Sequence, residues 1–240
     1  IHIIPDLRRL EEKYAEELVV IGVHSAKFTQ EGKTENIRRL VIRYDLEHAV
    51  INDHSMQVWR SYGARAWPTL MLIDPAGNVV GGVSGEGNHD VLDHAIGRII
   101  QTFENDPDHP IKRSHFELDL EKKAVANNEL LFPGKVLADE KNQRLFISDT
   151  SHHRILVTDL DGKVTHVYGA KGQPGWVDGS ATEARFAWPQ GMSFGPGEAG
   201  QNQLYIADTE NHVIRLINLE THEVSTVAGV GKQQYQLQSR

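Results

Sequence analysis

Two groups of residues have types and spacings that binding or catalytic sites use. The first is the tripeptide Trp67-Pro68-Thr69, which stands directly before an apolar run. The second is a pair of similar segments that begin at Asp149 and Asp208, 59 residues apart, each followed within four residues by histidine. A carboxylate beside an imidazole can bind a metal or move a proton. Which chemistry either group supports depends on the elements that hold it.

We expect the two aspartates to have a structural role, because short polar side chains satisfy turn backbone and let strands reverse. The sequence has no regularly spaced set of carboxylates, so it gives little support to calcium binding. The sequence therefore predicts no catalytic residue, no metal ligand and no cofactor. The alternative is that the polar residues of these segments serve as ligands. They are Asp149, His152, His153, Asp208, Asn211 and His212. A glycine-rich loop at 172–181 lacks the spacing of a phosphate-binding loop, so we interpret it as a connection.

Composition excludes several classes of function. The 240 residues contain no cysteine, which excludes disulfides, thiolate metal sites and cysteine nucleophiles within the chain. The net charge of −8 argues against nucleic acid as a partner, because that affinity is built from Lys and Arg. The longest apolar run, 18–23, is far shorter than the ~20 residues of a membrane span. The compartment is unknown from sequence, with a cytoplasmic location as the default guess.

Apolar periodicity predicts alternating helices and strands in the first 104 residues. We expect a helix from Pro5, a central strand at 18–23 buried on both faces, and a helix at 35–44. A strand at 49–51 and a helix capped by Ser55 follow. Residues 67–80 predict an antiparallel hairpin that Pro68 can only open, and 90–103 predict a last helix. The sheet is then parallel on one side and ends in a hairpin.

The order of hairpin and helix around Trp67-Pro68-Thr69 resembles the C-terminal half of the thioredoxin-like fold. The resemblance puts Pro68 at that family's cis-proline and implies that Trp67, Pro68 and Thr69 line a substrate groove. We favour a cis bond over a trans proline that merely opens the strand. Pro5 matches a proline in the family's first helix, which would place a Cys-x-x-Cys motif just before Ile1. We therefore expect residues 1–104 to lack the domain's first strand and that motif.

The second half predicts a repeat. The segment at 132–136 parallels 188–192, 145–155 parallels 204–214, and 167–169 parallels 227–229, so each unit spans about four short strands. These units resemble NHL repeats, which implies an all-β propeller of about two blades over 132–240, after a linker at 105–131. Because propellers close with ~4–8 blades, we expect an incomplete ring, closed by missing blades or by oligomerisation, and a fragment truncated at both ends.

The two halves together resemble the thioredoxin-like, NHL-repeat-containing protein family. The resemblance implies a thiol-disulfide or peroxide-linked redox module coupled to a propeller that binds a protein or peptide, with this cysteine-free chain itself redox-inert. The alternative is a non-enzymatic scaffold that binds its partner through the propeller. A propeller hydrolase or lyase would need a clustered acid-base or metal site, which neither unit supplies.

Overall fold

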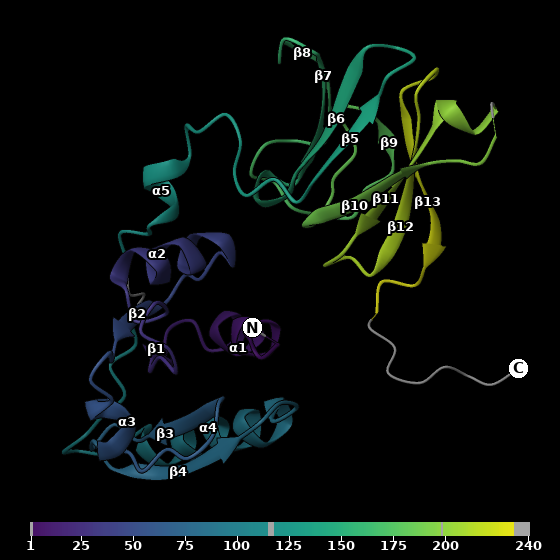
Figure 1. The fold of residues 1–240 in the computed structure, drawn as a ribbon. Helices are drawn as coiled ribbons and strands as arrows, with labels where there is room; N and C mark the ends of the chain where they lie inside the picture. The colour runs from purple at the N-terminus through teal and green to yellow at the C-terminus, as the bar shows by residue number, and fades with distance from the viewer. Residues whose placement is uncertain (1, 115–117, 198, 233–240) are drawn as a thin grey trace, which may run out of the picture. The chain divides into compact units, whose positions relative to one another are not determined.

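The computed structural model describes residues 2–114, 118–197 and 199–232, which fall into two compact units (Figure 1). The division lies between Ala126 and Asn127, inside the segment that we interpreted as a linker. The outermost bounds of the predicted domains, Ile1 and residues 233–240, lie outside the described residues.

The first unit alternates helices with short strands and continues with a hairpin, a long helix and a short last helix. Its elements are α1 (Ile4–Lys13), β1 (Ile21–His24), α2 (Thr34–Arg43), β2 (Ala49–Asn52), α3 (Gln57–Ser61), β3 (Thr69–Ile73), β4 (Val79–Ser84), α4 (His89–Phe103) and α5 (Lys122–Val125). The strands β1 and β2 pair in parallel, and β3 and β4 pair antiparallel, as the sequence predicts. The core forms where α1 and α4 pack on the hairpin, around Leu10, Leu92 and Ile96.

One prediction about the first strand is wrong. The strand begins three residues later than expected and is not buried on both faces, because Ile21 is 54% and Val23 41% exposed. Among the described residues β1 pairs with β2 alone, and the two pairs of strands form separate sheets. The apolar run still specifies a strand, but no described element covers this face.

The start of α3 also differs from the prediction. The residue before the helix is Met56, in a left-handed conformation with φ of 58°, and no side chain caps it there. Asp53, directly after β2, accepts hydrogen bonds from the backbone N–H groups of Val58 and Trp59 instead. Ser55 therefore does not cap the helix, because the aspartate satisfies the free N–H groups of its first turn.

Residues between α4 and the second unit are tied to the first unit by ion pairs. Arg113 donates to Glu104 with both terminal nitrogens and to Glu17 through Nε. Lys122 in α5 lies 3.0 Å from a carboxylate oxygen of Asp45. Such exposed pairs hold a segment in place more than they stabilise a fold.

The second unit consists of two antiparallel sheets joined by the glycine-rich loop. Its elements are β5 (Lys135–Asp139), β6 (Arg144–Asp149), η1 (Thr150–His152), β7 (Arg154–Asp159), β8 (Val164–Tyr168), β9 (Gly179–Ser180), β10 (Pro189–Phe194), η2 (Ala199–Asn202), β11 (Gln203–Asp208), β12 (Val213–Asn218) and β13 (Glu223–Gly229). The first sheet has the order β5-β6-β7-β8 and the second β10-β11-β12-β13-β9. Each sheet contains the four strands that the sequence predicts for one unit, and β9 is an addition to the second sheet.

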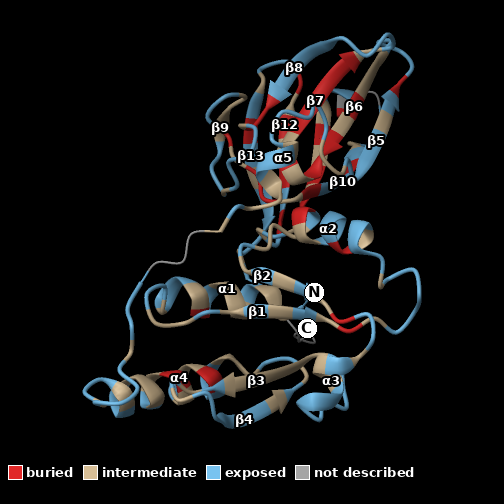
Figure 2. Ribbon diagram, turned by 90° about the vertical axis from the view of Figure 1, so that its left-hand side faces the viewer, coloured by how far each residue is buried: buried red, intermediate tan, exposed pale blue. Residues whose placement is uncertain are grey.

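The core of the second unit lies between its two sheets. Phe146, Ile155 and Val157 of the first sheet pack against Leu204, Ile206 and Ile217 of the second. Figure 2 shows buried residues along β6 and β7 of this unit. The glycine-rich loop contributes β9, which pairs with β13, and Trp176, whose Nε1 donates to Thr226 Oγ1. The loop therefore covers the outer edge of the second sheet.

Candidate functional site

The predicted site residues lie where α3 ends and the hairpin begins. The peptide bond between Trp67 and Pro68 is cis, which confirms that prediction. The carbonyl oxygen of Pro68 accepts a hydrogen bond from Gly85 N, and Thr69 pairs with Ser84 at the start of the hairpin. The Thr69 hydroxyl lies 3.0 Å from that of Ser84 and donates to Ala66 O at 2.7 Å. The loop is thus fastened to the first residues of both strands.

Trp67 is the largest exposed side chain of this loop, and three neighbours fix its orientation. Its ring stacks on Trp59 with centroids 4.1 Å apart, and its Nε1 donates to the carbonyl of Ser25 at 3.0 Å. The ammonium of Lys27 lies 4.4 Å from the ring centroid, a cation–π distance. The side chain nevertheless remains 45% exposed. A rigid, half-exposed indole is a surface on which an apolar or extended ligand can pack.

Asp53 positions Ser25 and Trp59, two of the residues that contact Trp67. Its carboxylate accepts from Ser25 Oγ at 2.9 Å and from the backbone N–H groups of Val58 and Trp59 at 3.1 and 2.9 Å. Burial opposes the charge, but the hydrogen bonds from Trp59, Val58 and Ser25 outweigh it and hold the pKa of Asp53 below its usual value. One buried carboxylate thereby links the strand end that carries Ser25 to the helix that carries Trp59.

The strand that follows the loop offers a backbone edge. Among the described residues β3 pairs with β4 only, so its other edge has no strand partner. An extended peptide can add to such an edge through main-chain hydrogen bonds. Trp67, Pro68 and Thr69 lie directly at its start. The arrangement suits binding, since it brings together aromatic rings, one cation and a free strand edge.

That Trp67, Pro68 and Thr69 line a substrate groove stays a prediction, and sequence reasoning missed the residues that support them. Trp59, Lys27 and Asp53 lie on different elements, and no spacing in the sequence joins them. A weak signal was present for Asp53, because a lone aspartate just after a strand and shortly before a helix is a common way to satisfy the free N–H groups of the helix.

The repeat aspartates have the structural role that the sequence favours. Asp149 accepts hydrogen bonds from Leu131 N at 2.7 Å, His152 Nδ1 at 2.8 Å and Arg154 Nε at 2.8 Å. Burial lowers the pKa of His152, although Asp149 acts in the opposite direction. These bonds tie the start of the unit to the turn between β6 and β7.

Asp208 repeats this arrangement in the second sheet. It accepts from Ala187 N at 2.7 Å, Asn211 Nδ2 at 2.8 Å and Arg215 Nη1 at 3.0 Å. Burial raises the pKa of Asp208, against hydrogen bonds from Asn211, Ala187 and Arg215 that lower it.

Within residues 2–114, 118–197 and 199–232, no three His, Asp or Glu side chains converge as metal ligands would. The same ranges hold no helix of the length and apolarity that crossing a membrane requires.

The fold and the loop define a thioredoxin-like domain followed by a repeat of four-stranded sheets. Residues 2–79 match the family model described as thioredoxin-like. The chain is similar to NHL repeat-containing protein 2 of Gallus gallus, with 40% identity over 235 residues, which is 97% of this chain and 31% of that protein. It is therefore a relative of the thioredoxin-like, NHL-repeat-containing proteins.

A plant protein shows the same likeness. The chain is 41% identical over 233 residues to Protein SUPPRESSOR OF QUENCHING 1, chloroplastic, of Arabidopsis thaliana, which is 96% of this chain and 22% of that protein. The chain thus spans less than a third of the length of either relative. Among solved structures, an auxiliary nutrient binding protein from Bacteroides thetaiotaomicron aligns at a TM-score of 0.34 with 28% identity, covering 39% of this chain and 25% of that one.

Proposed function

We propose that this chain is the peptide-docking part of a thiol-disulfide or peroxide-linked redox protein, with the repeat units serving as a propeller-type binding platform. The observation that carries the proposal is the fixed, half-exposed Trp67 beside the free edge of β3. The relatives support the pairing of a thioredoxin-like domain with NHL repeats in one protein. The chain contains no cysteine, so the thiols of such chemistry lie outside these 240 residues.

Each group of the loop has a role in this proposal. An extended substrate segment lies along β3 and hydrogen-bonds to its free edge, while the ring of Trp67 packs on one substrate side chain. Lys27 presents a positive charge next to that ring, which favours an acidic or aromatic neighbour in the substrate. Thr69 and Ser84 keep the loop in register with the hairpin.

The test is peptide binding measured with exposed-tryptophan variants. The probe is a fluorescein-labelled, extended ten-residue peptide with alternating apolar residues and one S-alkylated cysteine, followed by fluorescence anisotropy. We expect Trp67→Ala to weaken binding at least about tenfold, corresponding to ~1.4 kcal/mol. The matched control is Trp176→Ala, because Trp176 is exposed to the same degree, 46%, but lies in the other unit.

Circular dichroism and thermal unfolding show whether each variant still folds. Equal affinity of wild type and folded Trp67→Ala would rule out the loop as the docking site. A loss of binding in Trp176→Ala but not in Trp67→Ala would favour instead a scaffold that binds through the repeat units.

A further inference from the structure

Lys27 lies over the exposed ring of Trp67, and its ammonium group has no other partner among the described residues. Its Nζ is 4.4 Å from the ring centroid. Within the described parts of the chain this ammonium makes no ion pair and donates no hydrogen bond. An ammonium carries three N–H donors, and the face of an indole attracts its charge without offering a strong hydrogen-bond acceptor. The donors of Lys27 therefore remain available for the oxygen atoms of a ligand.

Two carboxylates of the same unit could neutralise this charge, and neither does so. Asp53 is only 4% exposed, and its carboxylate already accepts hydrogen bonds from a serine hydroxyl and two backbone N–H groups. Glu31 is the nearest acidic residue along the chain, but it forms no ion pair with Lys27 in the described structure. The positive charge beside the indole is thus uncompensated.

The segment that carries Trp67 is itself cationic. Residues 54–73 contain Arg60 and Arg65 and no acidic residue. Arg65 is exposed, stands two positions before Trp67, and makes no ion pair among the described residues. The whole chain, in contrast, has a net charge of −8. Local positive charge on a negative protein steers an anionic ligand to this loop and away from the remaining surface.

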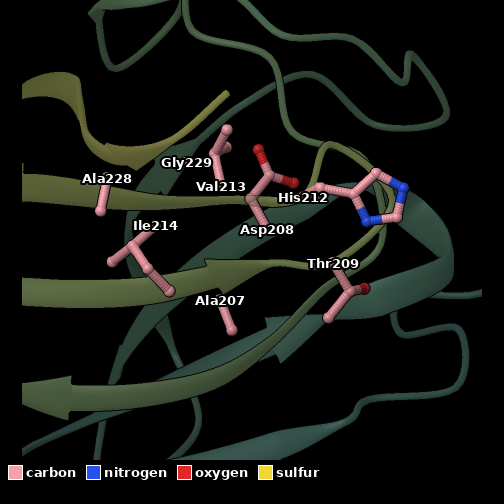
Figure 3. Close-up of a pocket in the computed structure, with 8 residues that line it drawn as sticks. All are labelled: Ala207, Asp208, Thr209, His212, Val213, Ile214, Ala228 and Gly229. Carbon is pink, nitrogen blue, oxygen red and sulfur yellow. The ribbon is translucent and has the colours of Figure 1, made fainter. Parts of the chain in front are cut away.

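The surface hollow of the second unit lacks such cations. It has a volume of about 240 Å³ and lies on β11, β12 and β13. Figure 3 shows Thr209 and Ile214 among its lining residues, none of which is Lys or Arg. The carboxylate among them, Asp208, is fully buried and paired with Arg215. This hollow therefore offers an acidic ligand no lysine or arginine to bind, and it can serve as a reference site.

We infer that Lys27 is a specificity-determining residue, through which the loop around Trp67 selects peptides with an acidic side chain next to the residue that packs on the indole. The inference rests on the proposed docking of an extended peptide along β3 and names the substrate class of that site. The substrate carboxylate accepts hydrogen bonds from the Lys27 ammonium, which stays over the ring. A carboxylate is preferred to an aromatic ring here, because a ring would leave the three N–H donors without an oxygen acceptor.

The experiment measures the binding of three fluorescein-labelled peptides to the full chain by fluorescence anisotropy. The peptides share the length, the apolar positions and the S-alkylated cysteine of the first probe, and they carry Glu, Gln or Lys at the remaining positions. We expect the Glu peptide to bind wild type at least about fivefold tighter than the Gln peptide, and the Lys peptide to bind weakest. Net charge alone predicts the opposite order, because a chain of charge −8 attracts the Lys peptide.

Substitutions of Lys27 test whether its charge sets this order. Lys27→Glu should reverse the order of the Glu and Lys peptides, and Lys27→Met should abolish the preference without loss of binding to the Gln peptide. Salt at 1 M should also abolish the preference in wild type, because the screening length falls to ~3 Å. Two control variants should keep the wild-type order: Lys33→Glu, at an exposed lysine before α2, and Ile214→Glu, in the hollow of the second unit. Circular dichroism shows that each variant folds.

Three results would overturn the inference. The first is equal affinity of wild type for the three peptides, or tightest binding of the Lys peptide. The second is a preference for the Glu peptide that persists in folded Lys27→Glu. The third is a preference that Lys33→Glu or Ile214→Glu abolishes and Lys27→Glu does not.

The Gln peptide distinguishes this failure from failure of the proposed docking site. If Trp67→Ala still weakens its binding, the docking site stands and only the role of Lys27 is wrong. If the Gln peptide binds wild type and Trp67→Ala equally, or if none of the three peptides binds wild type, both proposals are wrong.

Discussion

The hydroxyl of Tyr168 lies 2.7 Å from Nδ1 of His222 and so links the two sheets of the second unit. Tyr168 ends β8 of the first sheet and is almost completely buried, while His222 lies in the turn before β13 of the second. His222 also stacks on His166 of the first sheet, with ring centroids 4.7 Å apart. A polar contact thus closes one side of the core between the two sheets.

This contact predicts a loss of stability at high pH. Burial raises the pKa of Tyr168 to about 12, from an ordinary value of 10.0. The raised pKa means that the fold favours the neutral phenol, so its contribution is complete below pH ~10 and is lost as the pH rises toward 12. We expect the urea midpoint of the second unit to fall over that range in wild type and to stay flatter in Tyr168→Phe. A phenolate absorbance titration in which no tyrosine ionises late would contradict the assignment.

At low pH the first unit should respond through Asp53. The pKa of its carboxyl is held below the usual value, so the stability that it contributes is present above pH ~4 and is lost as the pH falls through the folded-state pKa. Asp53→Asn removes that pH dependence and destabilises the unit at pH 7, because the amide nitrogen cannot accept the N–H of Val58 or Trp59. Unfolding followed by tryptophan fluorescence at several pH values measures both effects. An Asp53→Asn variant with the wild-type acid profile would exclude this carboxylate as the cause.

The buried pair of Arg215 and Asp208 predicts a large effect of substitution. Both side chains are fully buried, and Arg215 also donates to the carbonyls of Arg185 and Val177 and to Asp178. Removing one partner of such a pair costs ~3–5 kcal/mol, since the other charge stays buried without it. We expect Arg215→Met to lower the free energy of unfolding by about that amount in urea melts.

Arg154→Met provides the matched control in the first sheet. Each carboxylate keeps two other donors, His152 and Leu131 for Asp149 as Asn211 and Ala187 for Asp208, but Arg154 is 14% exposed whereas Arg215 is fully buried. We expect a smaller loss than for Arg215→Met. Equal losses in the two variants would mean that burial of the arginine is not what sets the cost.

Much of the fold follows from local pattern. Helical spacing found α1, α2 and α4, and the turn residues 74–78 found the β3–β4 hairpin. Self-similarity found the four strands that the two sheets have in common, but not β9. The predictions that fail are those in which contacts between distant elements determine the structure. The run 18–23 has the composition of a strand buried on both faces, but burial depends on which elements cover it, and composition does not specify them. Ser55 is a good capping residue, yet Asp53 satisfies the N–H groups of the α3 start.

The candidate site likewise has a part that the sequence predicts and a part that it does not. The tripeptide 67–69 is contiguous, so its turn chemistry and its position before a strand can be predicted. The contacts that orient Trp67 come from residues that are 8, 40 and 42 positions away.

The segment between α4 and the second unit should be released by salt. Arg113 bridges Glu104 and Glu17, and these exposed ion pairs weaken as ionic strength shortens the range of charge interactions. We expect limited proteolysis within residues 105–126 to accelerate from 0.05 M to 1 M salt, over which the screening length shrinks roughly fourfold. Arg113→Ala should already show the fast cleavage at low salt. Lys123→Ala is the control, because Lys123 pairs only with nearby Asp119 in the described contacts, and it should cleave like wild type. Cleavage that is independent of salt in all three proteins would show that the ion pairs do not hold this segment.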